Sequence, residues 1–112
     1  MGPKRSISSK EGFSDIFDRP DQKHSTKNIL ILSKDNSLGF SRIGVAIRKR
    51  DNRLAVDRNN IKRKIKGSFL AKVLELPHKD FVVYVKKNLK GKEEELKRDL
   101  NKIWIKFTGN ND

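Results

Sequence analysis

"AVDRNNIKRKIKGSF" (residues 55–69) is the stretch that decides the fold, because it combines an apolar stripe with a dense run of cations. Five cationic side chains fall within positions 58–66, yet isoleucines occupy positions 61 and 65. At a helical advance of ~100° per residue, the apolar positions form one stripe: Ile61, Ile65, Phe69 and Val73. Polar positions form a second stripe beside it: Asn59, Lys62, Arg63 and Lys66. We therefore expect a helix that docks through the first stripe and exposes the second.

The ends of this helix are predicted from its flanking residues. Asp57 is a suitable N-cap, since its carboxylate can accept the free amide hydrogens of the first turn. Pro77 cannot continue a helix, so the helix is expected to run from Arg58 to about Leu76. The preceding "RDNRLAV" (50–56) is expected to be a loop, with a short additional strand considered at residues 54–56.

Two strands are expected before this helix. "KNILILS" (27–33) is rich in apolar residues and is followed by the turn-forming "KDNS" (34–37). "FSRIGVAIRK" (40–49) alternates, so one face carries Ile43, Val45 and Ile47. Its other face carries Arg42, Gly44, Ala46 and Arg48. The short polar connection predicts that the two strands pair as an antiparallel hairpin.

Three further elements are expected outside this region. "DFVVYVKK" (80–87) is typical of a buried strand, because its apolar residues run without alternation. "EEELKRDLNKIWIKF" (93–107) predicts an amphipathic helix that opens with acids, as the helix dipole favours. Helical spacing within "EGFSDIF" (11–17) predicts a short helix that begins near Ser9, capped by Ser8 or Ser9, and ends at Pro20.

The predicted order is α-β-β-(β)-α-β-α, which indicates an α+β fold. We expect a single-domain α/β sandwich, mainly one sheet of about four strands with helices packed on it. The domain is expected to span residues 9–107. A flexible basic tail is expected at 1–8 and a flexible polar tail at 108–112.

Composition restricts the classes of function. The formal net charge is +13, and residues 48–66 hold nine Lys or Arg against two Asp, so the charge forms a local patch. Such a patch favours a polyanionic partner, nucleic acid before an anionic membrane surface. The chain has no cysteine and two histidines, which disfavours zinc and thiolate chemistry. Apolar runs are too short to span a bilayer and the first residues lack a secretory signal, so a cytoplasmic location is expected.

The polar stripe suits a phosphate backbone. Each neutralised phosphate releases counterions, and arginine adds bidentate geometry. The alternative interpretation is a solvated cationic face without a partner.

Candidate catalytic groups are sparse in this sequence. Glu93, Glu94 and Glu95 could be imagined as metal ligands of a nuclease, but acids in a first helical turn complement the dipole. His24 and His78 are expected to be surface residues in polar loops. We predict that the protein supplies no catalytic residue and holds no tightly bound metal.

The basic helix resembles that of the protein subunit of bacterial ribonuclease P. The family has an Arg-Asn-Arg-x-x-Lys-Arg-like run after Ala-Val and before a Phe. The matching positions here are Ala55, Val56, Arg58, Asn59, Lys62, Arg63, Lys66 and Phe69. The strand before it is similar at Arg42, Gly44, Arg48 and Lys49, and the first helix is similar at Phe13 and Phe17. Asn60 replaces the motif's second arginine, and Asn52 is the candidate substitute for the family's asparagine before Ala-Val.

The resemblance implies a specific function. In the family, an RNA subunit with magnesium ions cleaves the 5′ leader from precursor tRNA by endonucleolytic hydrolysis. The small protein binds the catalytic RNA, and it binds the leader in a cleft between the sheet and the first helix. The implied RNA-binding residues are Arg58, Asn59, Lys62, Arg63, Lys66, Arg48 and Lys49. The implied leader-cleft residues are Phe13, Phe17 and Arg42.

The resemblance also implies a left-handed βαβ crossover, an exception to the usual right-handed rule. We expect no membrane association and no obligate protein partner. Two alternatives remain open. The first is a ribosomal or other RNA-binding protein without a processing role, and the second, ranked below it, is a DNA-binding module or a self-sufficient nuclease.

Overall fold

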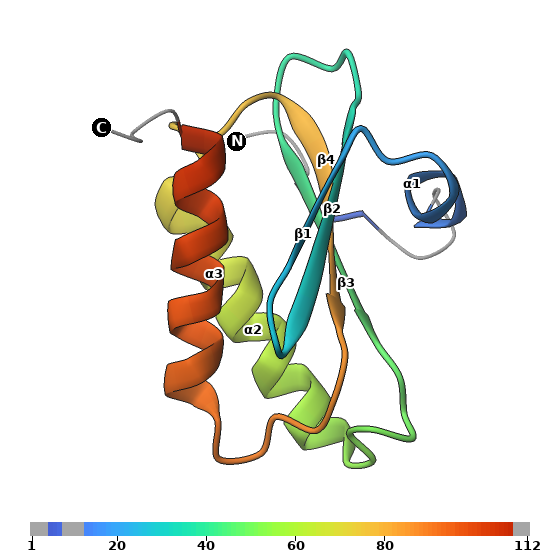
Figure 1. The fold of residues 1–112 in the computed structure, drawn as a ribbon, viewed down its shortest axis with the longest axis vertical. Helices are drawn as coiled ribbons and strands as arrows, with labels where there is room; N and C mark the ends of the chain where they lie inside the picture. Colours follow the sequence, from blue (N-terminus) through green and yellow to red (C-terminus); the bar gives the residue numbers. More distant parts are fainter. Residues whose placement is uncertain (1–4, 8–12, 109–112) are drawn as a thin grey trace.

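The structure, a computed structural model, describes residues 5–7 and 13–108 and has one mixed sheet between helices (Figure 1). The elements in chain order are α1 (Phe13–Asp18), β1 (Gln22–Ser25), β2 (Ile29–Asp35), β3 (Arg42–Ile47), α2 (Ala55–Lys72), β4 (Lys79–Val85) and α3 (Glu93–Thr108). Helices α2 and α3 cover one face of the sheet, and α1 lies on the other side. The predicted α+β class and the number of elements are confirmed. The predicted start of the first helix near Ser9, with its cap at Ser8 or Ser9, and most of both predicted tails lie outside the described residues.

The strand order is β1-β2-β4-β3, and it corrects the predicted hairpin. Strand β4 lies between β2 and β3, antiparallel to β2 and parallel to β3, so residues 27–33 and 40–49 do not pair with each other. The reason is the apolar run of β4, which needs cover on both faces and so takes a central position. The observed hairpin joins β1 to β2. Strand β1 was missed because "QKHS" is a polar edge strand without an apolar pattern.

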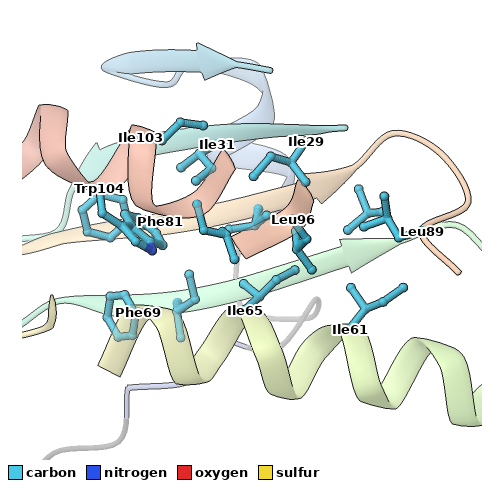
Figure 2. Close-up of a cluster of buried hydrophobic side chains, with 14 of the residues drawn as sticks. Ile29, Ile31, Ile61, Ile65, Phe69, Phe81, Leu89, Leu96, Ile103 and Trp104 are labelled. Atoms are coloured by element: carbon cyan, nitrogen blue, oxygen red, sulfur yellow. The ribbon is translucent and has the colours of Figure 1, made fainter. Parts of the chain in front are cut away.

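The main core fills the space between the sheet and helices α2 and α3 (Figure 2). Helix α2 contributes Ile61, Ile65 and Phe69, as its apolar stripe predicted. Aromatic rings from three elements meet in this core: Phe69, Phe81 and Trp104, with centroids 5.5–6.1 Å apart. The indole Nε1 of Trp104 donates a hydrogen bond to Ser68 Oγ at 3.0 Å, so its polar atom is satisfied. These contacts fix the rotation of α2 and therefore which of its flanks remains exposed.

The start of α2 differs from the prediction. The helix begins at Ala55 with Leu54 at the N-cap, and no side chain caps it. The amide of Arg58 donates to the Leu54 carbonyl at 3.1 Å, which closes a helical turn earlier than expected. Asp57 lies within the first turn, where its charge still suits the helix dipole. The short strand considered at residues 54–56 does not form, because these residues are helical or form the cap; the fourth strand is β1.

A second, smaller core lies between α1 and the sheet. Its buried residues are Ile7, Ile16, Leu32 and Val82, with Phe13, Leu30 and Ala46 packed against them. Residues 5–7, expected to be part of a flexible tail, run beside β3: the Ile7 amide donates to the Ile43 carbonyl at 2.8 Å. The reason is that Ile7 is apolar and its burial removes that surface from water.

Candidate nucleic-acid interface

The exposed flank of α2 carries the predicted cations. Asn59, Lys62 and Arg63 are exposed and Lys66 is half-buried, while the isoleucines beside them face the core. The apolar stripe of α2 therefore packs on the sheet, while the polar stripe, offset by part of a helical turn, faces solvent. We call these four residues, together with Arg48, Lys49 and Arg58, the basic surface.

Arg58 has a structural contact within the basic surface. Its Nη1 donates hydrogen bonds to the carbonyl oxygens of Asn52 at 3.0 Å and Arg53 at 2.7 Å. A guanidinium has five N–H donors, so Arg58 can hold this loop and still offer donors to an anion.

Asn52 connects the crossover loop, which is the segment 48–54 between β3 and α2, to the loop after β4. Its side chain is 1% exposed, its Nδ2 donates to the Lys87 carbonyl at 3.2 Å, and its Oδ1 accepts from the Leu89 amide at 3.2 Å. These bonds and those of Arg58 join the first turn of α2 to both loops. The sequence predicted only a loop here, because one asparagine in a polar segment gives no local sign of burial.

Arg48 lies where the basic surface meets the other face of the sheet. Its Nε donates to Asp51 Oδ2 at 2.9 Å, and its guanidinium lies over the Tyr84 ring at 5.6 Å from the centroid. Lys49, the next residue, is exposed. The side chain of Arg48 therefore borders both a cationic surface and an aromatic ring.

Phe17 and Tyr84 form an aromatic pair on the α1 side of the sheet, which we call the aromatic face. Their ring centroids are 6.0 Å apart at 88°, an edge-to-face contact, and Phe17 is 37% exposed. Tyr84 is held in the sheet opposite Leu30 and Ala46. The sequence missed Tyr84 because "FVVYV" resembles a wholly buried strand; the one polar ring in that run was the available signal.

Phe13 occupies a different place from Phe17, although both rings were predicted to line one cleft. Its ring lies over Gly44 of β3 and packs in the smaller core. The two rings therefore differ in exposure and in contacts.

Arg42, expected to supply charge to the cleft, is engaged with a carboxylate. Its Nε and Nη2 donate to the two oxygens of Asp80 at 2.8 and 2.7 Å, and Asn36 Nδ2 also donates to Asp80 at 2.8 Å. This half-buried bidentate pair balances the arginine charge locally. Arg42 therefore belongs to an ion-paired network at the start of β3, whereas the guanidinium of Arg48 lies beside the aromatic face.

The acidic and imidazole groups are the candidate metal ligands within residues 5–7 and 13–108. In this part of the chain, no three His, Cys, Asp or Glu side chains could hold one metal ion. His78 is exposed as predicted, but His24 lies in β1 with its ring 4.8 Å from that of Phe107. Burial lowers the pKa of His24, and the charge of Lys106 lowers it further. Among the described helices, none is long and apolar enough to cross a membrane.

Comparisons with known proteins identify relatives of this chain. The family model described as "Ribonuclease P" matches residues 1–108. The chain is 33% identical over 111 residues to the ribonuclease P protein component of Stutzerimonas stutzeri strain A1501, covering 98% of this chain and 85% of the relative. It is 41% identical over 93 residues to that of Escherichia coli O157:H7 strain EC4115, covering 82% and 77%.

Solved structures share the fold at lower identity. The ribonuclease P protein of Staphylococcus aureus superposes with a TM-score of 0.79 at 20% identity, covering 90% of this chain and 93% of that one. The protein from Thermotoga maritima gives a TM-score of 0.79 at 19% identity, covering 93% and 98%. At such identities the likeness supports the four-stranded sheet with three helices and nothing finer.

Proposed function

Because the chain belongs to the ribonuclease P protein family, we propose that it is the protein component of a ribonucleoprotein that removes 5′ leaders from precursor tRNA. Its direct partners are the catalytic RNA and the precursor tRNA, and it acts in the cytoplasm without an obligate protein partner. The observation that carries the proposal is the basic surface, held rigidly at the first turns of α2.

The basic surface supports binding to the catalytic RNA. Lys62 and Arg63 are exposed, and the buried isoleucines of α2 fix the side of the helix from which these cations can reach phosphates. Arg63 and Arg58 add bidentate donors that a lysine lacks. Asn59 offers both a donor and an acceptor to a sugar hydroxyl or base edge.

The aromatic face supports binding to the single-stranded leader. A single strand lacks duplex grooves, so proteins that bind one combine aromatic stacking with nearby positive charge. Phe17 provides an exposed ring, and Arg48 provides the charge over Tyr84. A folded tRNA body without its leader would leave this face unused.

The catalytic step belongs, in this proposal, to the RNA with its magnesium ions. In this proposal the protein holds no tightly bound metal; Glu93 and Glu94 open α3, and Asp80 pairs with Arg42. The chain's own contribution is to bind and orient, which favours the precursor over the product.

Reconstitution tests the function directly. The purified protein is added to the catalytic RNA of the same organism, and cleavage of precursor tRNA is followed at low magnesium concentration. The protein alone should not cleave, and with the RNA it should lower the KM for the precursor. Cleavage by the protein alone would indicate a nuclease, and RNA binding without any stimulation would indicate an RNA-binding protein with no processing role.

A further inference from the structure

Gly44 leaves a space on β3 that the ring of Phe13 fills. A Cβ at position 44 would lie 2.6 Å from Phe13 Cζ, closer still to its Cε1, and 3.3 Å from the Ile7 carbonyl oxygen. Gly44 is not in the left-handed region of backbone conformation, so its requirement is for space. The missing side chain thus lets an aromatic ring rest on the backbone of the strand.

Helix α1 is too short to hold its own position. It has six residues, and isolated helices of that length are unstable in water. Among the described residues, its contacts with the sheet include the Phe13 ring on Gly44, the buried Ile16, the edge contact of Phe17 with Tyr84, and an ion pair between Asp15 and Lys34 at 2.7 Å. The ion pair is exposed, and its hydrogen bond lowers the pKa of Asp15, but exposed pairs contribute little net stability. The apolar contacts therefore determine where α1 lies.

Phe17 follows Phe13 by one helical turn and depends on it for its place. A residue four positions along a helix lies on the same side, so the seating of Phe13 sets the height of Phe17 above Tyr84. Phe17 keeps 37% of its surface exposed and touches Tyr84 only by an edge contact. Phe13 instead packs beside Ile16 in the smaller core.

We propose that the two phenylalanines have separate roles: Phe13 is the anchor of α1, Phe17 is the ring that meets single-stranded RNA, and Gly44 is the positioning residue that sets their common distance from the sheet. This inference rests on the proposed function, since it assigns roles within the leader-binding face. The resemblance alone would assign leader binding to both phenylalanines, whereas this proposal assigns it to Phe17 and assigns the anchoring of α1 to Phe13.

The test compares binding of precursor and mature tRNA to the reconstituted complex. Gly44→Ala should raise Phe13, and with it α1, and so misplace Phe17. The preference for the precursor should fall by about 5- to 150-fold, the equivalent of one lost base stack. Affinity for mature tRNA should not change. Gly67→Ala is the matched control, because a Cβ at Gly67 of α2 meets nothing within 4 Å.

A second-site change distinguishes positioning from general damage. In Gly44→Ala with Phe13→Leu, the shorter side chain leaves room for the new methyl group, so the preference for the precursor should return in part. If Gly44→Ala folds and keeps the wild-type preference, or if Phe13→Leu restores nothing, the positioning role is wrong.

Two single variants decide the division of roles even if Gly44→Ala does not fold. Phe17→Leu should lower the precursor preference with the melting temperature nearly unchanged, whereas Phe13→Leu should lower the melting temperature. Equal thermal losses, or a retained preference in Phe17→Leu, would overturn the division. If the wild-type complex itself shows no preference for the precursor, the proposed function fails instead, so the two failures can be told apart.

Discussion

The basic surface and the aromatic face differ in how the chain assembles them. The basic surface comes mainly from one helix, and its first turn is fixed by hydrogen bonds through Asn52 and Arg58. The aromatic face combines α1 with the middle of β4, and apolar contacts on Gly44 hold it. Local periodicity is enough to place charges along one side of a helix. The aromatic face instead requires that α1 and β4, which are far apart in the sequence, be correctly positioned against each other.

The two surfaces should also respond differently to salt. Phosphate contacts release counterions and weaken steeply as salt rises. Stacking on Phe17 involves little net charge and should persist, whereas the charge contributed by Arg48 beside it should weaken with salt. If both surfaces bind RNA as proposed, salt and substitution should separate their contributions.

The largest effect is expected from removing cations of α2. The triple variant Lys62→Ala, Arg63→Ala and Lys66→Ala should bind the catalytic RNA far more weakly, with a salt slope shallower by about 2–3. Arg58 is kept, because it also holds the crossover loop. Filter binding at several salt concentrations measures both quantities.

The control for this variant removes the same charge from α3. Lys97→Ala, Arg98→Ala and Lys102→Ala should change the salt slope much less. Equal losses from the two triple variants would mean that only net charge matters. The preference for precursor over mature tRNA should survive the α2 variant, since that preference is assigned to the aromatic face.

An intermediate effect is expected from Asn52→Ala. The change leaves the Leu89 amide and the Lys87 carbonyl without their partner, which should lower the free energy of unfolding by about 1–3 kcal/mol. Urea unfolding measures this loss. Asn60→Ala, the same change at an exposed position of α2, should stay within about 0.5 kcal/mol of wild type. A neutral Asn52→Ala would show that packing alone fixes the crossover loop.

The smallest effect is expected from neutralising the acidic residues at the start of α3. Glu93→Gln and Glu94→Gln should leave the rate of single-turnover cleavage by the reconstituted complex unchanged, because neither surface uses them. Thermal stability should decrease slightly, by about 0.3–1 kcal/mol per charge, since acids favour this end of the helix dipole. A carboxylate whose loss abolished cleavage, with folding and RNA binding intact, would contradict an RNA-only chemical step.

The sequence predicted the features that depend on local periodicity, namely which face of a helix or strand is buried. The stripe of Ile61, Ile65 and Phe69 predicted both the docking of α2 and its exposed flank, and the alternation in residues 43–47 predicted the two faces of β3. The pairing of β2 and β3 with β4 was not predicted, because the strand order depends on which strand must be covered on both faces. The partners of Arg42 and the burial of Asn52 were missed for a similar reason: each contacts residues more than thirty positions away.

The central place of β4 has a consequence for how the chain acquires its structure. Strands β2 and β3 do not pair with each other, and both pair with a strand that begins at Lys79. No amino-terminal fragment that ends before this strand can contain the sheet, although it already carries the whole basic helix. Long-range pairing of this kind slows folding, because the loop must close before the contacts form. During synthesis the cationic segment therefore leaves the ribosome before β4, the strand that joins β2 and β3 into one sheet.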